Sequence, residues 1–179
     1  MTLKLELVTR DLTQYDAQLE QYRQAYATQN EVLHGGFGLD QSNSTIEAWR
    51  ELVDTYRFRA TVPANLVPAE TYLVIRQADQ RLVGLLNLRL ELNDYLRQYG
   101  GHIGYSIALG EWGKGYGTEM LRLGLQQAKA HGIASVLITC DEVNCGSARV
   151  IEKNGGILEN KVVDPNDQTT TCRYWIAIP

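Results

Sequence analysis

Apolar and polar residues alternate along several short stretches of the chain, and elsewhere the apolar residues recur every three or four positions. Residues 3–7, L-K-L-E-L, alternate strictly and predict a strand with one buried face. From Leu12 to Gln29 apolar and aromatic residues recur at helical spacing, which predicts an amphipathic helix. A second helix is predicted after Ser44, which stands at capping-box spacing from Glu47.

The remainder of the chain continues this mixture of elements. Further strands are predicted by β-branched and apolar runs at residues 72–76, 82–90, 103–109, 136–139, 157–163 and 172–178. Further helices are predicted at residues 116–131 and 147–154, and residues 92–99 fit a short helix or a loop. The order β-α-α-β-β-β-α-β-α-β-β predicts an α/β fold with a mixed sheet rather than a purely parallel one. The length of 179 residues and the lack of repeats predict one domain over residues 1–179.

Composition limits the classes of partner. The formal net charge of -4 gives no global attraction to nucleic acid or to an anionic membrane, so neither is expected as a partner. The three cysteines form no C-x-x-C pair, so neither a metal site nor a disulfide framework is expected. No signal-peptide pattern or long apolar run is found, and we therefore expect a cytoplasmic protein. A monomer or a homodimer is compatible with these features.

A glycine-rich stretch, L-G-E-W-G-K-G-Y-G-T-E-M, separates a predicted strand from a predicted helix. Gly113, Gly115 and Gly117 would let the backbone approach an anion at the helix N-terminus, where N–H groups lack intrahelical acceptors. Lys114 could add a positive charge. The spacing fits neither the phosphate loop of nucleotide hydrolases nor the dinucleotide fingerprint. Taken alone, the stretch also fits a tight turn without a ligand.

Two motifs in register resemble those of the GNAT superfamily of N-acetyltransferases. W-G-K-G-Y-G at residues 112–117 resembles its acetyl-CoA signature, [QR]-x-x-G-x-[GA]. N-C-G-S-A-R-V-I-E-K-N-G-G at residues 144–156 resembles its N-x-x-[AS]-x-x-[LV]-[YI]-E-K-x-G-[FG]. The order of the elements and the sequence G-H-I-G-Y-S-I are similar to those of a bacterial branch of acetyltransferases. Trp112 replaces the usual Gln or Arg, and Ile151 replaces a Tyr that protonates the leaving thiolate in many members.

The resemblance implies which residues contact acetyl-CoA. Main-chain groups of Ile107, Ala108 and Leu109 would bind the pantetheine arm and the acetyl carbonyl. The pyrophosphate would lie on the turn and helix start formed by Trp112, Gly113, Lys114, Gly115, Tyr116, Gly117 and Thr118. Asn144 would contact the cofactor, although an Asn before a short helix also fits an N-cap, and the two roles are compatible. Ser147 would face the sulfur.

Candidates for the base that removes the amine proton lie on two neighbouring predicted strands. His102 stands where some members carry a Glu with this role, and its ordinary pKa near 6.5 suits a base at neutral pH. Glu91, at the end of the preceding strand, is the second candidate. Each also fits a residue without function, a surface histidine or a solvated carboxylate. Tyr105 fits either the acceptor site or packing.

The resemblance implies an acetyl-CoA-dependent N-acetyltransferase. An acetyl group would pass to a primary amine of a small molecule or peptide by direct attack in a ternary complex, and Ser147, water or solvent would assist thiolate release. The alternative is a non-catalytic acyl-CoA-binding sensor on the same fold. A nucleotide-binding protein is disfavoured by the glycine spacing. The first two helices and residues 92–101 are expected to form the acceptor pocket.

Overall fold

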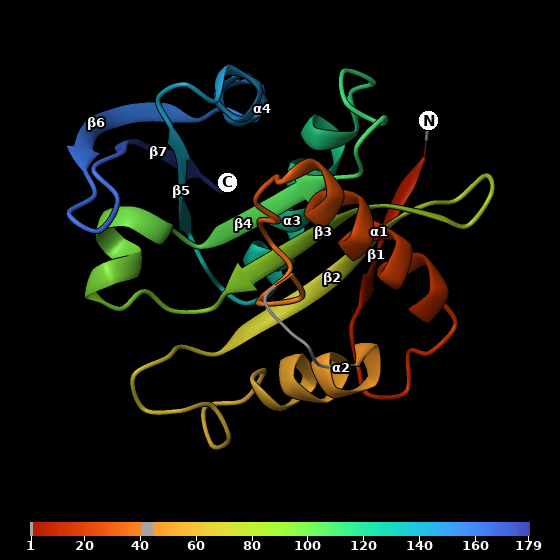
Figure 1. Cartoon of the computed structure of the whole chain (residues 1–179). Coiled ribbons are helices and arrows are strands. Elements are labelled where there is room, and N and C mark those ends of the chain that lie inside the picture. Colours follow the sequence, from red (N-terminus) through yellow and green to blue (C-terminus); the bar gives the residue numbers. More distant parts are fainter. Residues whose placement is uncertain (1, 41–44) are drawn as a thin grey trace.

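The chain folds in the order of elements that the sequence predicts (Figure 1). A computed structural model describes residues 2–40 and 45–179. Its elements are β1 (Leu3–Leu7), α1 (Asp16–Gln29), α2 (Ile46–Thr55), β2 (Ala69–Arg76), β3 (Arg81–Arg89), η1 (Leu96–Gly100), β4 (Ile103–Ile107), α3 (Tyr116–Ala130), β5 (Ser135–Asp141), α4 (Cys145–Lys153), β6 (Ile157–Val163) and β7 (Thr170–Ala177).

The strands form two antiparallel sheets. The first has the order β1-β2-β3-β4 and the second the order β5-β7-β6. The predicted α/β class is therefore confirmed, while the pairing within each sheet is antiparallel where a mixed sheet was expected. Strands β2 and β3 pair through a short connection, as antiparallel neighbours do. Between the sheets, β4 and β5 are both edge strands.

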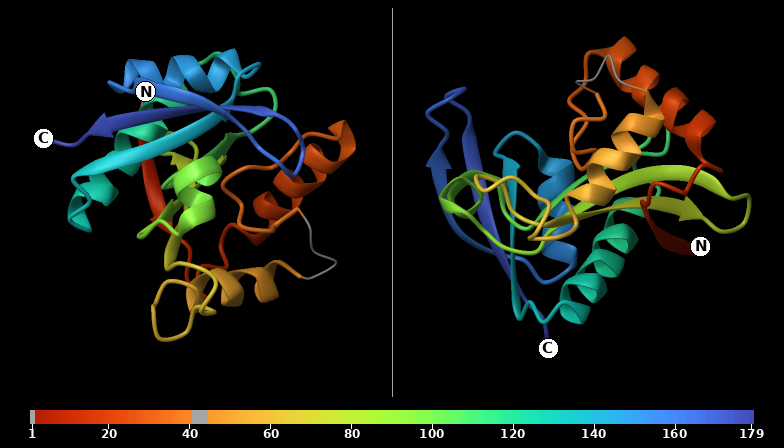
Figure 2. Two further views of the ribbon diagram at one scale, coloured as in Figure 1. Left: turned by 90° about the vertical axis from the view of Figure 1, so that its left-hand side faces the viewer. Right: turned by 90° about the horizontal axis from the view of Figure 1, so that it is seen from below.

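Helices cover both faces of the first sheet (Figure 2). One apolar cluster lies between this sheet, α1 and α2, and it includes the fully buried Leu85. The other lies between the sheet, α3 and the second sheet, and it includes the fully buried Leu86. Because both faces are covered, β2 and β3 are apolar along most of their length instead of alternating.

The ends of several elements differ from the prediction. Helix α1 begins at Asp16 because the residues before it form consecutive turns, with Leu12 N donating to Thr9 O. Ser44, the predicted cap of α2, lies outside the described residues. Thr45 caps this helix instead, its Oγ1 accepting from Ala48 N at 3.1 Å. Residues 96–100 form the single π-helical turn η1 within the stretch expected to be a helix or a loop.

The two sheets touch at the N-terminal end of β4. His102 N donates to Leu137 O at 2.7 Å, directly after Gly101, which has a φ of +64°. A Cβ at Gly101 would lie 2.6 Å from Leu137 O, so the two strands close on each other there with no room for a side chain. Across the ranges described, no helix is both long enough and apolar enough to cross a membrane.

Candidate active site

One edge of β4 carries main-chain groups that pair with no other strand among the described residues. Arg89 N donates to His102 O and Ala108 N donates to Val83 O, so the even-numbered residues of β4 bond to β3. In an antiparallel ladder the intervening residues point their N–H and C=O groups the other way. Tyr105 and Ile107 therefore direct these groups toward the space between β4 and β5. An extended molecule can bind along such an edge.

The glycine turn follows this edge directly and leads into α3. Gly110, Gly113 and Gly115 have φ values of +81°, +76° and +83°, in the left-handed region that favours glycine. Gly115 stands at the N-cap of α3 and, having no side chain, gives no hydrogen bond to the first N–H groups of the helix. Gly117 differs, because a Cβ there would lie 3.0 Å from Val150 of α4. The turn thus leaves the start of α3 without a side-chain cap, and Gly117 allows α3 to pack against α4.

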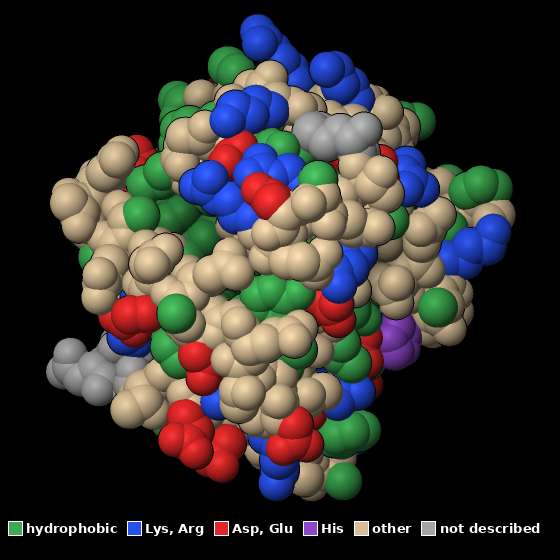
Figure 3. Space-filling view, turned by 90° about the vertical axis from the view of Figure 1, so that its right-hand side faces the viewer, with side chains coloured by type: hydrophobic (Ala, Val, Ile, Leu, Met, Phe, Trp, Pro, Cys, Tyr) green, Lys and Arg blue, Asp and Glu red, His purple; other side chains and the backbone are tan. Residues whose placement is uncertain are grey.

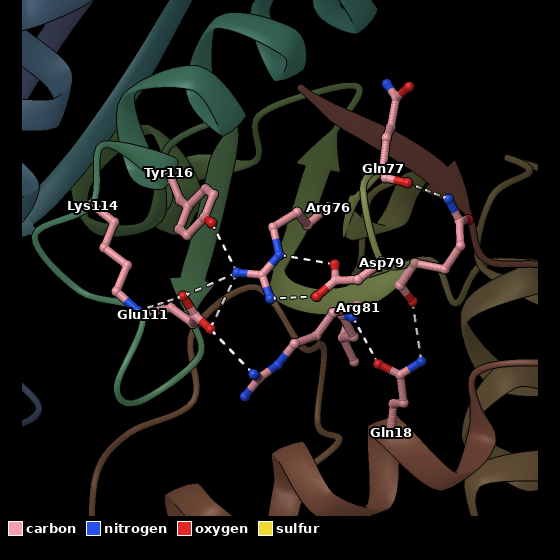
Figure 4. Close-up of polar contacts among 10 residues, drawn as sticks. Gln18, Arg76, Gln77, Asp79, Arg81, Glu111, Lys114 and Tyr116 are labelled. Atoms are coloured by element: carbon pink, nitrogen blue, oxygen red, sulfur yellow. Dashed lines mark hydrogen bonds and ion pairs between the residues drawn. The ribbon is translucent and has the colours of Figure 1, made fainter. Parts of the chain in front are cut away.

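A buried carboxylate fixes the turn to the β2–β3 hairpin (Figure 4). Glu111 is only 4% exposed, and its carboxylate lies 2.9 Å from Lys114 Nζ, 3.4 Å from Arg76 and 3.5 Å from Arg81. Arg76 also donates to the Tyr116 hydroxyl at 2.9 Å. The hydrogen bond from Lys114 is the main reason that the Glu111 pKa lies below its ordinary value. Three cations therefore surround one carboxylate beside the predicted phosphate site.

Mixed charge is also visible on the outer surface. On the face shown in Figure 3, Lys and Arg side chains are interspersed with Asp and Glu side chains. No single sign of charge covers this face.

Trp112 lies on the end of β4. Its indole is 58% exposed, and Nε1 donates to Ile107 O at 2.9 Å. Tyr26 of α1 donates to the same carbonyl at 2.7 Å. Ala108 and Leu109 pack against the cluster under α1 and α2. Ile107, Ala108 and Leu109, which were predicted to bind the acetyl-CoA arm, therefore hold the end of β4 to α1.

Asn144 and Ser147 lie at the start of α4. Asn144 Oδ1 accepts from Ser147 N at 3.0 Å, so the predicted N-cap is present. The Ser147 hydroxyl lies 2.7 Å from the hydroxyl of Tyr105, which links α4 to β4. Burial raises the pKa of Tyr105 well above its ordinary value, so the phenol stays protonated at neutral pH. Ile151 is fully buried in the core and has no proton to donate.

The two predicted bases have different surroundings. His102 is 8% exposed, and its Nδ1 accepts from Leu137 N at 2.9 Å, so the lone pair of this nitrogen is occupied. Burial, and after it the charges of Arg89 and Arg97, lower the His102 pKa to about 4. Glu91 is exposed and forms an ion pair with Arg59. Within the described part of the chain no hydrogen bond joins His102 to Glu91.

The family profile described as "Acetyltransferase (GNAT) domain" matches residues 6–157. This span contains β4, the glycine turn, α3 and α4.

The chain belongs to the GNAT acetyltransferase family.

Membership makes it an acyltransferase, an N-acetyltransferase that depends on acetyl-CoA.

Solved structures of similar fold are acetyltransferases. One is the acetyl transferase from Salmonella typhimurium that modifies the N-terminal serine of 50S ribosomal subunit protein L7/L12. It is 20% identical, with a TM-score of 0.68 over 100% of this GNAT chain and 96% of that chain. Another is RimL, a ribosomal L7/L12 alpha-N-protein acetyltransferase in complex with coenzyme A. It is 19% identical, with a TM-score of 0.70 over 99% and 95% of the two chains.

The name of a third similar structure refers to a different kind of acceptor. The spermidine/spermine N-acetyltransferase SpeG from Vibrio cholerae is 17% identical, with a TM-score of 0.61 over 98% of this GNAT chain and 95% of that chain. No curated protein sequence matches the chain. At these identities the similar structures establish the fold alone.

Sequence reasoning missed several residues of this GNAT site. Arg76 and Arg81 lie 35 and 30 residues before Glu111, as ladder partners on either side of the turn that joins β2 to β3, and the register of this hairpin decides that both reach it. The only local signal was Glu111 itself, an acidic residue inside a glycine turn that was expected to bind an anion. The Tyr105–Ser147 pair was also missed, because it joins residues 42 positions apart.

Proposed function

We propose that this GNAT protein transfers an acetyl group from acetyl-CoA to a primary amine of a small molecule or peptide, by direct attack in a ternary complex. The observation that carries the proposal is the free edge of β4, which runs directly into the glycine turn and the N-terminus of α3. An extended thioester arm can bind along this edge while its phosphates reach the helix N-terminus. A cytoplasmic location and a monomeric or homodimeric state remain predictions.

The main chain of β4 would hold the reacting carbonyl. Ala108 N already donates to Val83 O, and Ile107 O already accepts from Tyr26 and Trp112. The N–H groups of Tyr105 and Ile107 on the free edge are therefore the donors we assign to the acetyl-CoA arm. Donors fixed in this way polarise a carbonyl without reorganising during the reaction.

Ser147 and Tyr105 would stabilise the departing thiolate. Their hydroxyls are 2.7 Å apart, between the free edge of β4 and the start of α4. Since burial keeps the Tyr105 phenol protonated, the pair can supply a hydrogen bond to a developing negative charge. This arrangement would take the role of the Tyr that many family members carry at the position of Ile151.

Of the two predicted bases, we assign to Glu91 the removal of the amine proton. The proton would reach Glu91 through a water molecule. The carboxylate of Glu91 is exposed, so water can reach its oxygens. The Nδ1 lone pair of His102 is occupied by the Leu137 N–H, so this nitrogen cannot take the amine proton without losing its contact to β5. His102 would then position β4 against β5.

Amines of two kinds occur among the acceptors in the names of the similar structures. Two names refer to the amino terminus of a ribosomal protein, and one refers to polyamines. Both kinds are primary amines, which supports the amine acceptor but not a choice between them.

The experiment is a thermal melt of the purified protein with acetyl-CoA, ATP or NAD, followed by an acetylation assay against a panel of amines. A ligand at about a hundred times its Kd adds roughly 2.7 kcal/mol to the free energy of unfolding, and we expect this only with acetyl-CoA. In the assay Glu91→Gln should lower kcat by roughly a hundredfold, within the range for a lost general base. No melting shift with saturating acetyl-CoA would overturn the proposal, and a shift without turnover of any amine would support the sensor instead.

A further inference from the structure

The side chain of Trp112 lies at the end of the free edge of β4. Ile107 is the last residue of this strand, and its carbonyl points toward the space between β4 and β5. The indole Nε1 donates to this carbonyl at 2.9 Å, so the indole lies on the free-edge side of the strand. The ring is 58% exposed and belongs to the glycine turn that follows β4. A molecule that extends along the edge to the start of α3 therefore passes this ring.

The carbonyl of Ile107 has no lone pair left for a ligand. A carbonyl oxygen has two lone pairs, and this one accepts from Trp112 Nε1 and, at 2.7 Å, from the Tyr26 hydroxyl. Tyr26 is buried on α1, so its hydrogen bond also holds the strand end to the helix. A ligand at this end of the edge therefore meets the apolar face of the indole in place of a free carbonyl.

The chemistry of acetyl-CoA matches this order of groups. The amides of its arm suit the main-chain groups of Tyr105 and Ile107, as an added strand would. Between the outer amide and the phosphates, the arm has a carbon that carries two methyl groups. With the amides along β4 and the phosphates at the start of α3, this dimethyl carbon comes to the position of Trp112.

We propose that the indole of Trp112 binds the dimethyl segment of the acetyl-CoA arm and so determines where the arm leaves β4 for the glycine turn. This inference rests on the proposed function and adds a contact to it. The hydrogen bond to Ile107 O fixes the ring before the cofactor arrives, which lowers the entropic cost of binding. Trp112 was expected beside the pyrophosphate, and its side chain is assigned to the arm instead.

The test separates the arm of the cofactor from its nucleotide. Wild-type protein and Trp112→Ala would be titrated with CoA, with pantetheine, which is the arm without the nucleotide, and with ADP, which lacks the arm. Because the exposed part of an indole would be buried, Trp112→Ala should raise the Kd of CoA and of pantetheine by about tenfold. The Kd of ADP should be unchanged. In turnover of an amine, this variant should raise KM for acetyl-CoA by about tenfold and leave kcat nearly unchanged.

Two further variants test the contact. Trp112→Phe keeps an aromatic face and loses only the N–H, so it should recover most of the affinity that Trp112→Ala loses. Phe58→Ala is the matched control, since Phe58 is 54% exposed and follows α2, outside the assigned edge. This control should leave the Kd values of all the ligands unchanged.

The fluorescence of Trp112 gives a readout that a merely structural role would not change. CoA and pantetheine should shift the emission of the wild type to shorter wavelength, because the ring leaves water. The shift should be lost in Trp112→Phe. It should persist in Trp175→Phe, which removes a half-buried indole whose Nε1 donates to Glu159 at 2.9 Å in the second sheet.

The outcomes separate this inference from the proposed function. Equal Kd values of CoA for the wild type and Trp112→Ala, or tighter binding by the variant, would overturn the inference. A Kd of ADP that rises as much as that of CoA would assign the ring to the nucleotide and overturn it as well. In each of these cases CoA still binds the wild type, and the proposed function stands. Failure of CoA to bind the wild type would remove the proposed function together with the inference.

Discussion

The imidazole of His102 binds the main chain of the second sheet. Its Nδ1 accepts the Leu137 N–H, and the adjacent main-chain N–H donates back to Leu137 O. This contact requires a neutral ring, since a protonated imidazole has no lone pair to accept with. In the folded chain this histidine therefore links β4 to β5.

The first prediction concerns the pH dependence of stability. The His102 pKa of about 4 in the folded protein lies below its ordinary 6.5, so the unfolded chain binds the proton first. Its contribution is therefore complete above about pH 6.5 and is lost as the pH falls toward 4. Between pH 7 and pH 5 the wild type should lose roughly 2 kcal/mol through this residue.

Urea unfolding at pH 7 and pH 5 measures this loss. His102→Asn retains an acceptor for Leu137 N–H but does not titrate, so the loss between the two pH values should be smaller in this variant. His34 and His131 are present in both proteins, so they do not contribute to the difference between them. Equal losses in the two proteins would contradict the assignment.

The glycine turn depends on backbone conformation more than on space. A Cβ at Gly115 would meet nothing within 4 Å, yet its φ of +83° is strained for any residue with a side chain. We predict that Gly115→Ala lowers the free energy of unfolding by roughly 1–2 kcal/mol and weakens acetyl-CoA binding. Thermal melts with and without acetyl-CoA measure both effects.

Gly132 supplies the matched control for this turn. It has a φ of +75°, equally open surroundings, and a place at the opposite end of α3. Gly132→Ala should therefore cost a similar free energy while the shift caused by acetyl-CoA is unchanged. If both variants bind acetyl-CoA as the wild type does, the turn has no part in the cofactor site.

The order of the elements and the position of the turn could be predicted because they depend on neighbouring residues. Apolar periodicity marks α3, and glycines mark the turn before it. The cap of α4 at Asn144 was found for the same reason. In contrast, the pairing of Glu111 with Arg76 depends on the register of the β2–β3 hairpin, and the occupied lone pair of His102 depends on how β5 approaches β4. No local pattern encodes either contact.

In the molecule as a whole, two antiparallel sheets leave a pair of edge strands facing each other. We predict that the amides of Tyr105 and Ile107 exchange hydrogen faster than that of Ala108, which donates to Val83 O. Saturating acetyl-CoA should slow the first two, since they are the assigned donors, and leave Ala108 unchanged. Site-resolved hydrogen exchange measures this difference, and equal protection of all three amides without ligand would contradict the assigned edge.

The contact at Gly101 has a mechanical consequence. The sheets meet where this glycine leaves no gap to Leu137 O, and β4 continues from that point to Ile107 along the edge assigned to the acetyl-CoA arm. The contact at Gly101 is thus a fixed point from which β4 and β5 both extend. A methyl group at position 101 would push β4 and β5 apart at this contact, and we expect the displacement to grow along both strands toward the edge assigned to the acetyl-CoA arm. We therefore expect the width available to an acyl chain on this edge to depend on Gly101, a residue outside the edge assigned to that chain.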